Sequence, residues 1–166
     1  MRYNKKMSDD TKKIYPIVGK IFSSPYDWGG TKLIPDTLGF TPEPGVPYAE
    51  YWIGAHKRAP SLVESTGRTL EDMIKDDPER ILGTEVAKKF NQELPYLFKL
   101  SDSIKMLSVQ VHPNKEQAIE GFAEEEKTGI PATELRRTFK DPNSKTEMAL
   151  AIGDFWMLFG LRPQKE

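Results

Sequence analysis

Residues 107–113 read LSVQVHP, and the alternation in this stretch decides which fold the sequence predicts. Side chains of an extended strand point to opposite faces in turn, so Ser108, Gln110 and His112 share one face. A leucine and two valines occupy the other face. Pro113 then ends the strand because it has no backbone N–H to donate. The stretch predicts a β-strand with one polar face and one face in an apolar core.

A second stretch, TEMALAI at residues 146–152, repeats this division. Glu147 shares its face with two alanines, whereas the methionine, leucine and isoleucine point the other way. A carboxylate followed by two small side chains leaves space in front of the sheet. We therefore expect this strand to line a pocket.

Other strands are indicated by aromatic and β-branched runs. YAEYWIG at residues 48–54 predicts a strand on which Glu50 shares a face with Tyr48 and Trp52. Residues 96–100 and 104–112 are expected to form a hairpin with its turn around Ser101-Asp102. Residues 147–163 read as two apolar strands joined by a turn at Gly153-Asp154.

Helices are expected between these strands. Thr69 followed by Asp72 resembles a capping box, and Asp77-Pro78 looks like an N-cap with proline at the first helical position. These signals predict a small helical insert around residues 69–91. Asn114 is the expected N-cap of a further helix, and residues 132–139 suggest another short one.

The arrangement of these elements favours a mainly β protein. Many short strands separated by turns, with helices gathered in inserts, are typical of a β-sandwich or jelly roll rather than a doubly wound parallel sheet. Residues 1–13 are polar without a hydrophobic period, so we expect a flexible tail there. The length of 166 residues suits one domain, over residues 14–166.

Charge and composition exclude several classes of protein. The 24 basic and 25 acidic residues are spread along the chain, which argues against nucleic acid or an anionic membrane as a partner. The charged start lacks the apolar run of a secretory signal, and no run approaches the ~18 apolar residues of a membrane span. We expect a cytoplasmic protein. The sequence does not indicate an oligomeric state.

The absence of cysteine leaves His, Asp, Glu and Gln as candidate metal ligands. Gln110, His112 and Glu147 offer an amide oxygen, an imidazole and a carboxylate, which suit zinc or a similar divalent ion if the two strands are neighbours. Spacing alone leaves open a polar strand face satisfied by hydrogen bonds. His56, beside Lys57 and Arg58, is more simply explained as a structural or solvent-facing residue.

Four strings in the chain resemble the type I phosphomannose isomerases. They are YDWGG (26–30), YAEYWIGAHKRAPS (48–61), LPYLFKLSDSIKMLSVQVHPNKEQA (94–118) and FKDPNSKTEMALAI (139–152). The resemblance extends over about residues 15–163, and the last two strings are long and specific. It implies a cupin-type jelly roll with a helical insert. It also implies the interconversion of mannose 6-phosphate and fructose 6-phosphate with one zinc ion.

The resemblance also implies roles for individual residues. Gln110, His112 and Glu147 lie where the family has three zinc ligands. The sugar phosphate would be contacted by Trp28, Lys99 and Ser108, of which the last two are the expected phosphate contacts. Glu50 and Lys145 would also line the sugar-phosphate pocket. For the proton transfer itself, Glu50, Lys145 and a zinc-bound water are the candidate helpers, and the sequence does not rank them.

The chain departs from the family's pattern in two ways. Ser144 and Thr146 stand where the family commonly has His and Pro, which removes no ligand. Family members usually continue well past residue 166, and that later part supplies a fourth ligand, a histidine, and a catalytic arginine. We therefore expect this chain to be the amino-terminal part of a longer enzyme, with little or no isomerase activity alone. The alternatives are a shortened non-catalytic cupin module that binds a sugar phosphate or metal, and a purely structural domain.

Overall fold

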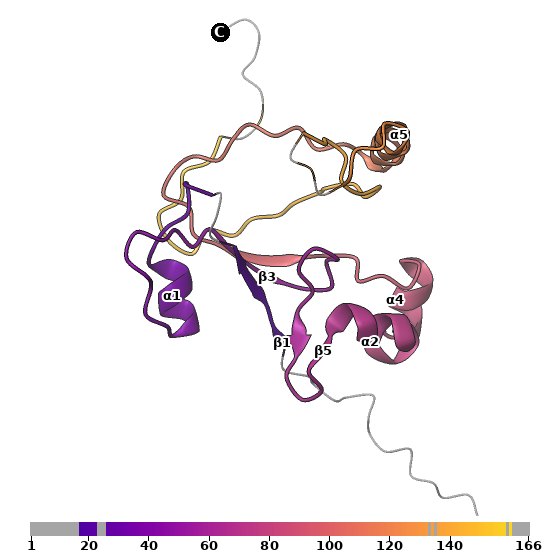
Figure 1. Cartoon of the computed structure of the whole chain (residues 1–166), viewed down its shortest axis with the longest axis horizontal. Helices are drawn as coiled ribbons and strands as arrows, with labels where there is room; N and C mark the ends of the chain where they lie inside the picture. The colour runs from indigo at the N-terminus through magenta and orange to yellow at the C-terminus, as the bar shows by residue number, and fades with distance from the viewer. Residues whose placement is uncertain (1–16, 23–25, 133, 135, 159, 161–166) are drawn as a thin grey trace, which may run out of the picture. The chain divides into compact units, whose positions relative to one another are not determined.

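The computed structural model describes residues 17–22, 26–132, 134, 136–158 and 160 (Figure 1). The expected tail at residues 1–13 lies outside this range. The chain divides into two compact parts, residues 1–105 and residues 106–166. We describe each part by itself.

The first part contains two small antiparallel sheets. In one sheet β3 (Glu50–Ile53) is the central strand between β2 (Lys20–Phe22) and β6 (Phe98–Ser101). In the other sheet β4 (Leu62–Val63) lies between β1 (Ile17–Val18) and β5 (Arg68–Thr69). The predicted hairpin at residues 96–112 is wrong, because β6 pairs with β3 and Ser103 forms a bridge with Gly29. Long-range pairing thus overrides the local turn signal.

The helices of the first part are α1 (Leu33–Leu38), α2 (Leu70–Asp76), α3 (Pro78–Leu82) and α4 (Thr84–Lys89). The last three form a cluster within the expected insert at residues 69–91 (Figure 1). The predicted caps are confirmed. The Thr69 hydroxyl accepts a hydrogen bond from Asp72 N at 3.0 Å, and the Asp77 carboxylate accepts one from Arg80 N at 3.2 Å. Each cap satisfies a backbone donor that the first helical turn leaves unpaired.

Asp102 ties the end of β6 to the start of α1. Its carboxylate accepts hydrogen bonds from the backbone N–H groups of Leu33 at 2.9 Å and Lys32 at 3.3 Å. Gly30 makes room for this carboxylate, since a Cβ at that position would lie 2.1 Å from Asp102 Oδ1. The YDWGG string therefore contains a glycine whose lack of a side chain is required by packing.

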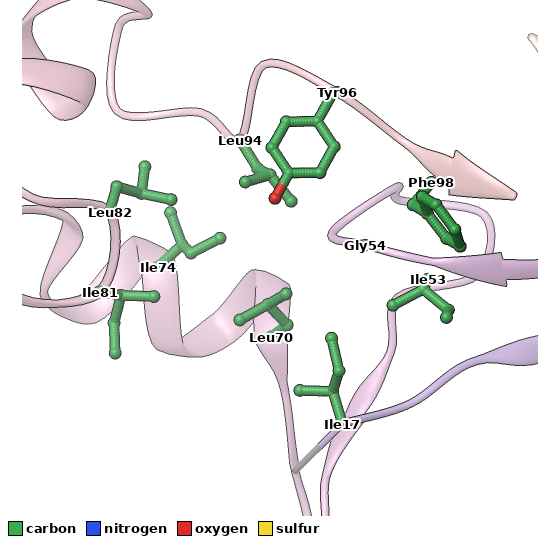
Figure 2. A pocket seen from close by; sticks show the side chains of 10 residues that line it. All are labelled: Ile17, Ile53, Gly54, Leu70, Ile74, Ile81, Leu82, Leu94, Tyr96 and Phe98. Carbon is green, nitrogen blue, oxygen red and sulfur yellow. The ribbon is translucent and has the colours of Figure 1, made fainter. Parts of the chain in front are cut away.

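An apolar pocket with a volume of about 360 Å³ lies in the first part (Figure 2). Ile53 of β3 and Phe98 of β6 line it from the sheet, and Leu70 and Ile74 of α2 line it from the helical insert. Among the ten labelled side chains the Tyr96 hydroxyl is the one polar side-chain group. Ile53 and Phe98 are cross-strand partners, so they point to the face opposite Trp52 and its partner on β6. The apolar pocket thus lies between the helical insert and one face of this sheet, and Glu50, Trp52 and Lys99 belong to the opposite face.

The second part contains α5 (Lys115–Glu126) and otherwise turns and loops among its described residues. Asn114 is its N-cap in a capping box, as predicted: its side chain accepts a hydrogen bond from Gln117 N at 2.9 Å, and the Gln117 side chain accepts one from Asn114 N. The predicted helix at 132–139 is wrong for its described residues, which lie in turns and bends. Arg137 in this stretch is buried and hydrogen-bonds the carbonyl oxygens of Ile130 and Phe139.

The strands predicted from the two deciding stretches are also not formed. Residues 106–112 and 145–152 contain no regular strand, and the described residues after the bend at 152–153 contain none either. Their apolar side chains are exposed; Val111 is 93% and Met148 is 98% accessible. A strand needs a neighbour for its backbone groups and a cover for its apolar face, and the described residues of this part supply neither.

The prediction of a mainly β protein is therefore met only in part. The structure has two small three-stranded sheets, and its helices contain more of the described residues than its strands do. None of the helices that the structure describes is both long and apolar enough to cross a membrane.

Candidate metal centre and sheet-face cluster

The second part brings the three predicted metal ligands together. Nε2 of His112 lies 3.5 Å from Oε1 of Gln110 and 3.7 Å from Oε2 of Glu147. Around a tetrahedral zinc ion with bonds of about 2.0–2.2 Å, neighbouring ligand atoms are about 3.3–3.6 Å apart. The two distances are close to that spacing. The imidazole nitrogen therefore lies near both an amide oxygen and a carboxylate oxygen. Each of these two distances is compatible with two ligands of the same cation.

The amide of Gln110 is oriented by its neighbour. Its Nε2 donates to Ser108 Oγ at 3.4 Å, and its Oε1 faces His112. A group that orients a ligand in this way supports metal binding from outside the coordination shell. Ser108 thus has a geometric role in the metal group in addition to the phosphate contact that the resemblance implies.

The number of metal ligands that this site can offer depends on the Gln110 amide. Within the described part of the chain, no three imidazole, carboxylate or thiol groups cluster closely enough to hold a metal by themselves. A metal held here would take two ligands of the preferred kinds, from His112 and Glu147, and would need the neutral Gln110 oxygen as the third. The side chain of His112 is 28% exposed and that of Glu147 is 53% exposed, so a further ligand or water has access.

The first part contains a cluster of three side chains, Glu50, Trp52 and Lys99, which we call the sheet-face cluster. It lies on the face of the β2-β3-β6 sheet away from the apolar pocket. Oε1 of Glu50 lies 3.4 Å from Nζ of Lys99, and Oε2 of Glu50 accepts a hydrogen bond from Nε1 of Trp52 at 2.8 Å. Nζ of Lys99 also lies 4.7 Å from the centre of the Trp52 ring. An anion, a cation and an aromatic ring therefore meet in one cluster.

Strand register explains why these residues meet. Glu50 and Trp52 are two apart on β3, so they share a face, as predicted. Lys99 of β6 is the direct cross-strand partner of Trp52. Directly opposed residues have Cβ atoms about 4.5–5.5 Å apart, which brings their side chains into contact. The alternation on β3 is visible in the sequence, whereas its pairing with β6 is a property of the tertiary structure.

The remaining predicted residues lie apart from these contacts. Trp28 is half-buried and packs on Tyr26 with ring centres 5.4 Å apart. Lys145 is exposed and lies two positions before Glu147. His56 packs edge-on against Trp52 with ring centres 5.0 Å apart, and its Nδ1 accepts a hydrogen bond from Arg58 N. This structural role agrees with the interpretation of His56 from the sequence. The residue that the sequence analysis missed is Trp52, for which the only signal was its spacing from Glu50.

Comparison with known proteins places these residues in a family. Residues 20–164 match the family model for the phosphomannose isomerase type I catalytic domain. The chain is 38% identical over 144 residues to mannose-6-phosphate isomerase of Escherichia coli, covering 85% of this chain and 37% of that protein. It is 37% identical over 152 residues to mannose-6-phosphate isomerase of Schizosaccharomyces pombe, covering 85% of this chain and 33% of that protein.

Solved structures show the same relationship. A crystal structure of mannose 6-phosphate isomerase bound with zinc and yttrium superposes with a TM-score of 0.67 at 36% identity, over 77% of this chain and 32% of that one. The apo form of mannose 6-phosphate isomerase from Salmonella typhimurium gives a TM-score of 0.65 at 36% identity, over 79% and 33%. The chain thus spans about a third of the length of these relatives. It belongs to the type I phosphomannose isomerase family, with residues 20–164 matching the family's catalytic domain.

Proposed function

We propose that the protein carrying this sequence is a zinc-dependent aldose-ketose isomerase that interconverts mannose 6-phosphate and fructose 6-phosphate. Membership of the family and the names of the curated relatives support this reaction. The similarity to solved structures also supports a cupin-type jelly roll as the fold to which the chain contributes. The activity is proposed for the protein as a whole, since the chain covers 37% of the Escherichia coli relative.

The observation that carries the proposal is the approach of His112 Nε2 to both the Gln110 amide and the Glu147 carboxylate, at 3.5 and 3.7 Å. These three residues would hold the zinc ion. When bound, zinc supplies a Lewis acid that polarises a sugar carbonyl or hydroxyl oxygen. Zinc is named in a solved relative, which supports its choice over other divalent ions.

The chain's own residues supply binding and proton transfer in this proposal. Lys99 and Ser108 offer an ammonium and a hydroxyl to the phosphate, and Trp28 offers an aromatic surface to the sugar. Isomerisation moves a proton between adjacent carbons, which requires a base that can also act as an acid. Glu50 holds an ionisable carboxylate on the sheet face, and Lys145 lies beside Glu147 in sequence; we assign the proton transfer to these two.

The metal centre is tested by counting zinc bound to the purified chain after dialysis against a metal buffer. We expect one zinc per chain, and loss of that zinc in His112→Ala and in Glu147→Ala. His56→Ala is the matched control because it removes the other histidine, and it should keep one zinc. Equal zinc content in His112→Ala and His56→Ala would contradict the proposed centre.

The reaction is tested by following mannose 6-phosphate and fructose 6-phosphate with the protein that carries this sequence. Activity should vanish on zinc removal and return when zinc is added. His112→Ala should stay inactive at zinc concentrations that restore the unmodified protein. One bound zinc and sugar-phosphate binding without turnover would instead favour the non-catalytic module.

A further inference from the structure

The indole of Trp52 contacts both charged residues of the sheet-face cluster, Glu50 and Lys99. We propose that Trp52 is a positioning residue that holds Glu50 and Lys99 in one fixed arrangement. The contacts of Trp52 with Glu50 and Lys99 do not depend on the proposed function. The inference that they help to bind a sugar phosphate rests on it. Neither the family match nor the sequence pattern assigns such a role to Trp52.

Trp52 acts on Glu50 through a directed hydrogen bond. Its Nε1–H donates to Oε2 of Glu50 at 2.8 Å, which is a short distance for an N–H donor and typical of a charged acceptor. The indole N–H is a donor only, and a carboxylate oxygen is an acceptor, so the two groups are complementary. The bond therefore fixes one oxygen of the ionised carboxylate and directs the other towards Lys99.

Trp52 acts on Lys99 through the face of its ring. The Lys99 ammonium lies 4.7 Å from the ring centre, within the range of a cation–π interaction. Its distance of 3.4 Å to Oε1 of Glu50 is long for a hydrogen bond between charged groups. The ammonium is thus held in place by two moderate attractions and keeps protons free for an anionic ligand.

The indole itself is immobilised by its neighbours. Trp52 is 7% exposed and packs against the rings of Phe22 and His56, with ring centres 4.4 and 5.0 Å away. It lies on the central strand of its sheet, hydrogen-bonded to a strand on each side. A buried aromatic ring has few rotamers, so the groups that it contacts inherit its fixed position.

This arrangement suits a phosphate monoester better than a neutral ligand. The side chains of Glu50 and Lys99 are 15% and 26% exposed, so water competes little for them. A free lysine in solution has many rotamers to lose on binding an anion, whereas Lys99 is already restrained. Trp52 would therefore lower the entropic cost of phosphate binding without touching the phosphate.

The spectroscopic test uses the three tryptophans of the chain, whose indole N–H signals are resolved by nitrogen-edited NMR and assigned by the loss of one signal in Trp52→Phe. In Glu50→Gln the Trp52 indole proton should move upfield, because a charged acceptor is replaced by a neutral one. Lys20→Met is the matched control, since Lys20 is the other cross-strand partner of Trp52 and is exposed. An indole signal that is unmoved in Glu50→Gln, or moves equally in Lys20→Met, would overturn the proposal.

The functional test measures mannose 6-phosphate affinity in a double-mutant cycle. Trp52→Phe keeps an aromatic body and should weaken binding by up to about tenfold, the factor that corresponds to immobilising one flexible side chain on binding. In the Lys99→Met background the same change should have no further effect, because Trp52 acts through the pair. Equal weakening in both backgrounds would show that Trp52 acts by another route and would refute the positioning role.

The outcomes separate this inference from the proposed function. If the unmodified protein fails to bind mannose 6-phosphate, the proposed function is contradicted, and the indole signals alone decide the role of Trp52. If mannose 6-phosphate binds and the indole signal is insensitive to Glu50→Gln, the proposed function stands and the positioning role falls.

Discussion

Replacing Arg137 with methionine should destabilise the second part of the chain strongly. Arg137 is 4% exposed, and its guanidinium donates to the carbonyl oxygens of Phe139 at 2.9 Å and Ile130 at 2.7 Å. Nη2 also lies 2.5 Å from Oε1 of Glu126, close but poorly directed for a hydrogen bond. Methionine keeps an unbranched apolar chain but removes every donor, together with the guanidinium whose Cζ lies 4.8 Å from the centre of the Phe122 ring. The variant therefore isolates the polar role of Arg137 from its packing.

The size of the effect follows from these contacts. Removing one partner of a buried charge pair typically costs about 3–5 kcal/mol. Glu126 keeps access to water, with a side chain 55% exposed, so we take the lower end and expect a loss of about 3 kcal/mol. For a chain of this size that loss corresponds to a fall of about 6–12 °C in the midpoint of thermal unfolding.

The assay is thermal unfolding followed by circular dichroism, with amide hydrogen exchange at Phe139 to localise the change. Phe139 N donates to Oε2 of Glu125 at 2.7 Å and should exchange faster in the variant. Arg136→Met is the matched control because Arg136 is exposed, and it should change stability by less than about 0.5 kcal/mol. Similar midpoints for the two variants would refute the assignment of Arg137 as the polar anchor of this part.

Two further predictions concern packing and pH. Gly30→Ala should cost about 1–3 kcal/mol, because the new Cβ would lie 2.1 Å from Asp102 Oδ1, whereas Gly153→Ala, with open space around it, should be close to neutral in the same unfolding assay. Burial raises the pKa of the Glu125 carboxyl. Hydrogen bonds from the backbone N–H groups of Phe139 and Thr138, together with the charge of the Arg137 guanidinium, outweigh burial and hold this pKa below the usual 4.5. Because the folded pKa is the lower one, this stabilisation is present above pH 4.5 and is lost as the pH falls through the folded value. The stability difference between the unmodified chain and Glu125→Gln should therefore shrink on acidification, and a difference that grows would contradict the sign.

The starts of α2, α3 and α5 were predictable from the sequence because each depends on a side-chain cap within three residues, whereas α1, which has no such cap, was not predicted. Thr69, Asp77 and Asn114 all cap helices as their spacing indicated. The hairpins were not predictable, because a strand pairs with whichever strand the whole chain brings beside it. The run at residues 96–100 contributes to β6, yet its partner is β3, a distant segment whose Trp52 lies directly opposite Lys99. The apolar alternation at residues 107–111 indicated a buried face, and the structure leaves that face exposed.

By itself the sequence determined the chemistry available to this protein: which ligand types it offers, which residues share a face of β3, where α2, α3 and α5 begin, and which family its longest strings resemble. Only the tertiary structure decided which of those groups meet. It brings Glu147 within 3.7 Å of His112 and sets Lys99 between Glu50 and the Trp52 ring. The physical reason is range. A helix cap or the alternation of side chains on a strand depends on residues a few positions apart. Contact between side chains that are distant in sequence depends on many weak interactions, which together must offset the entropy lost when the intervening chain is closed into a loop.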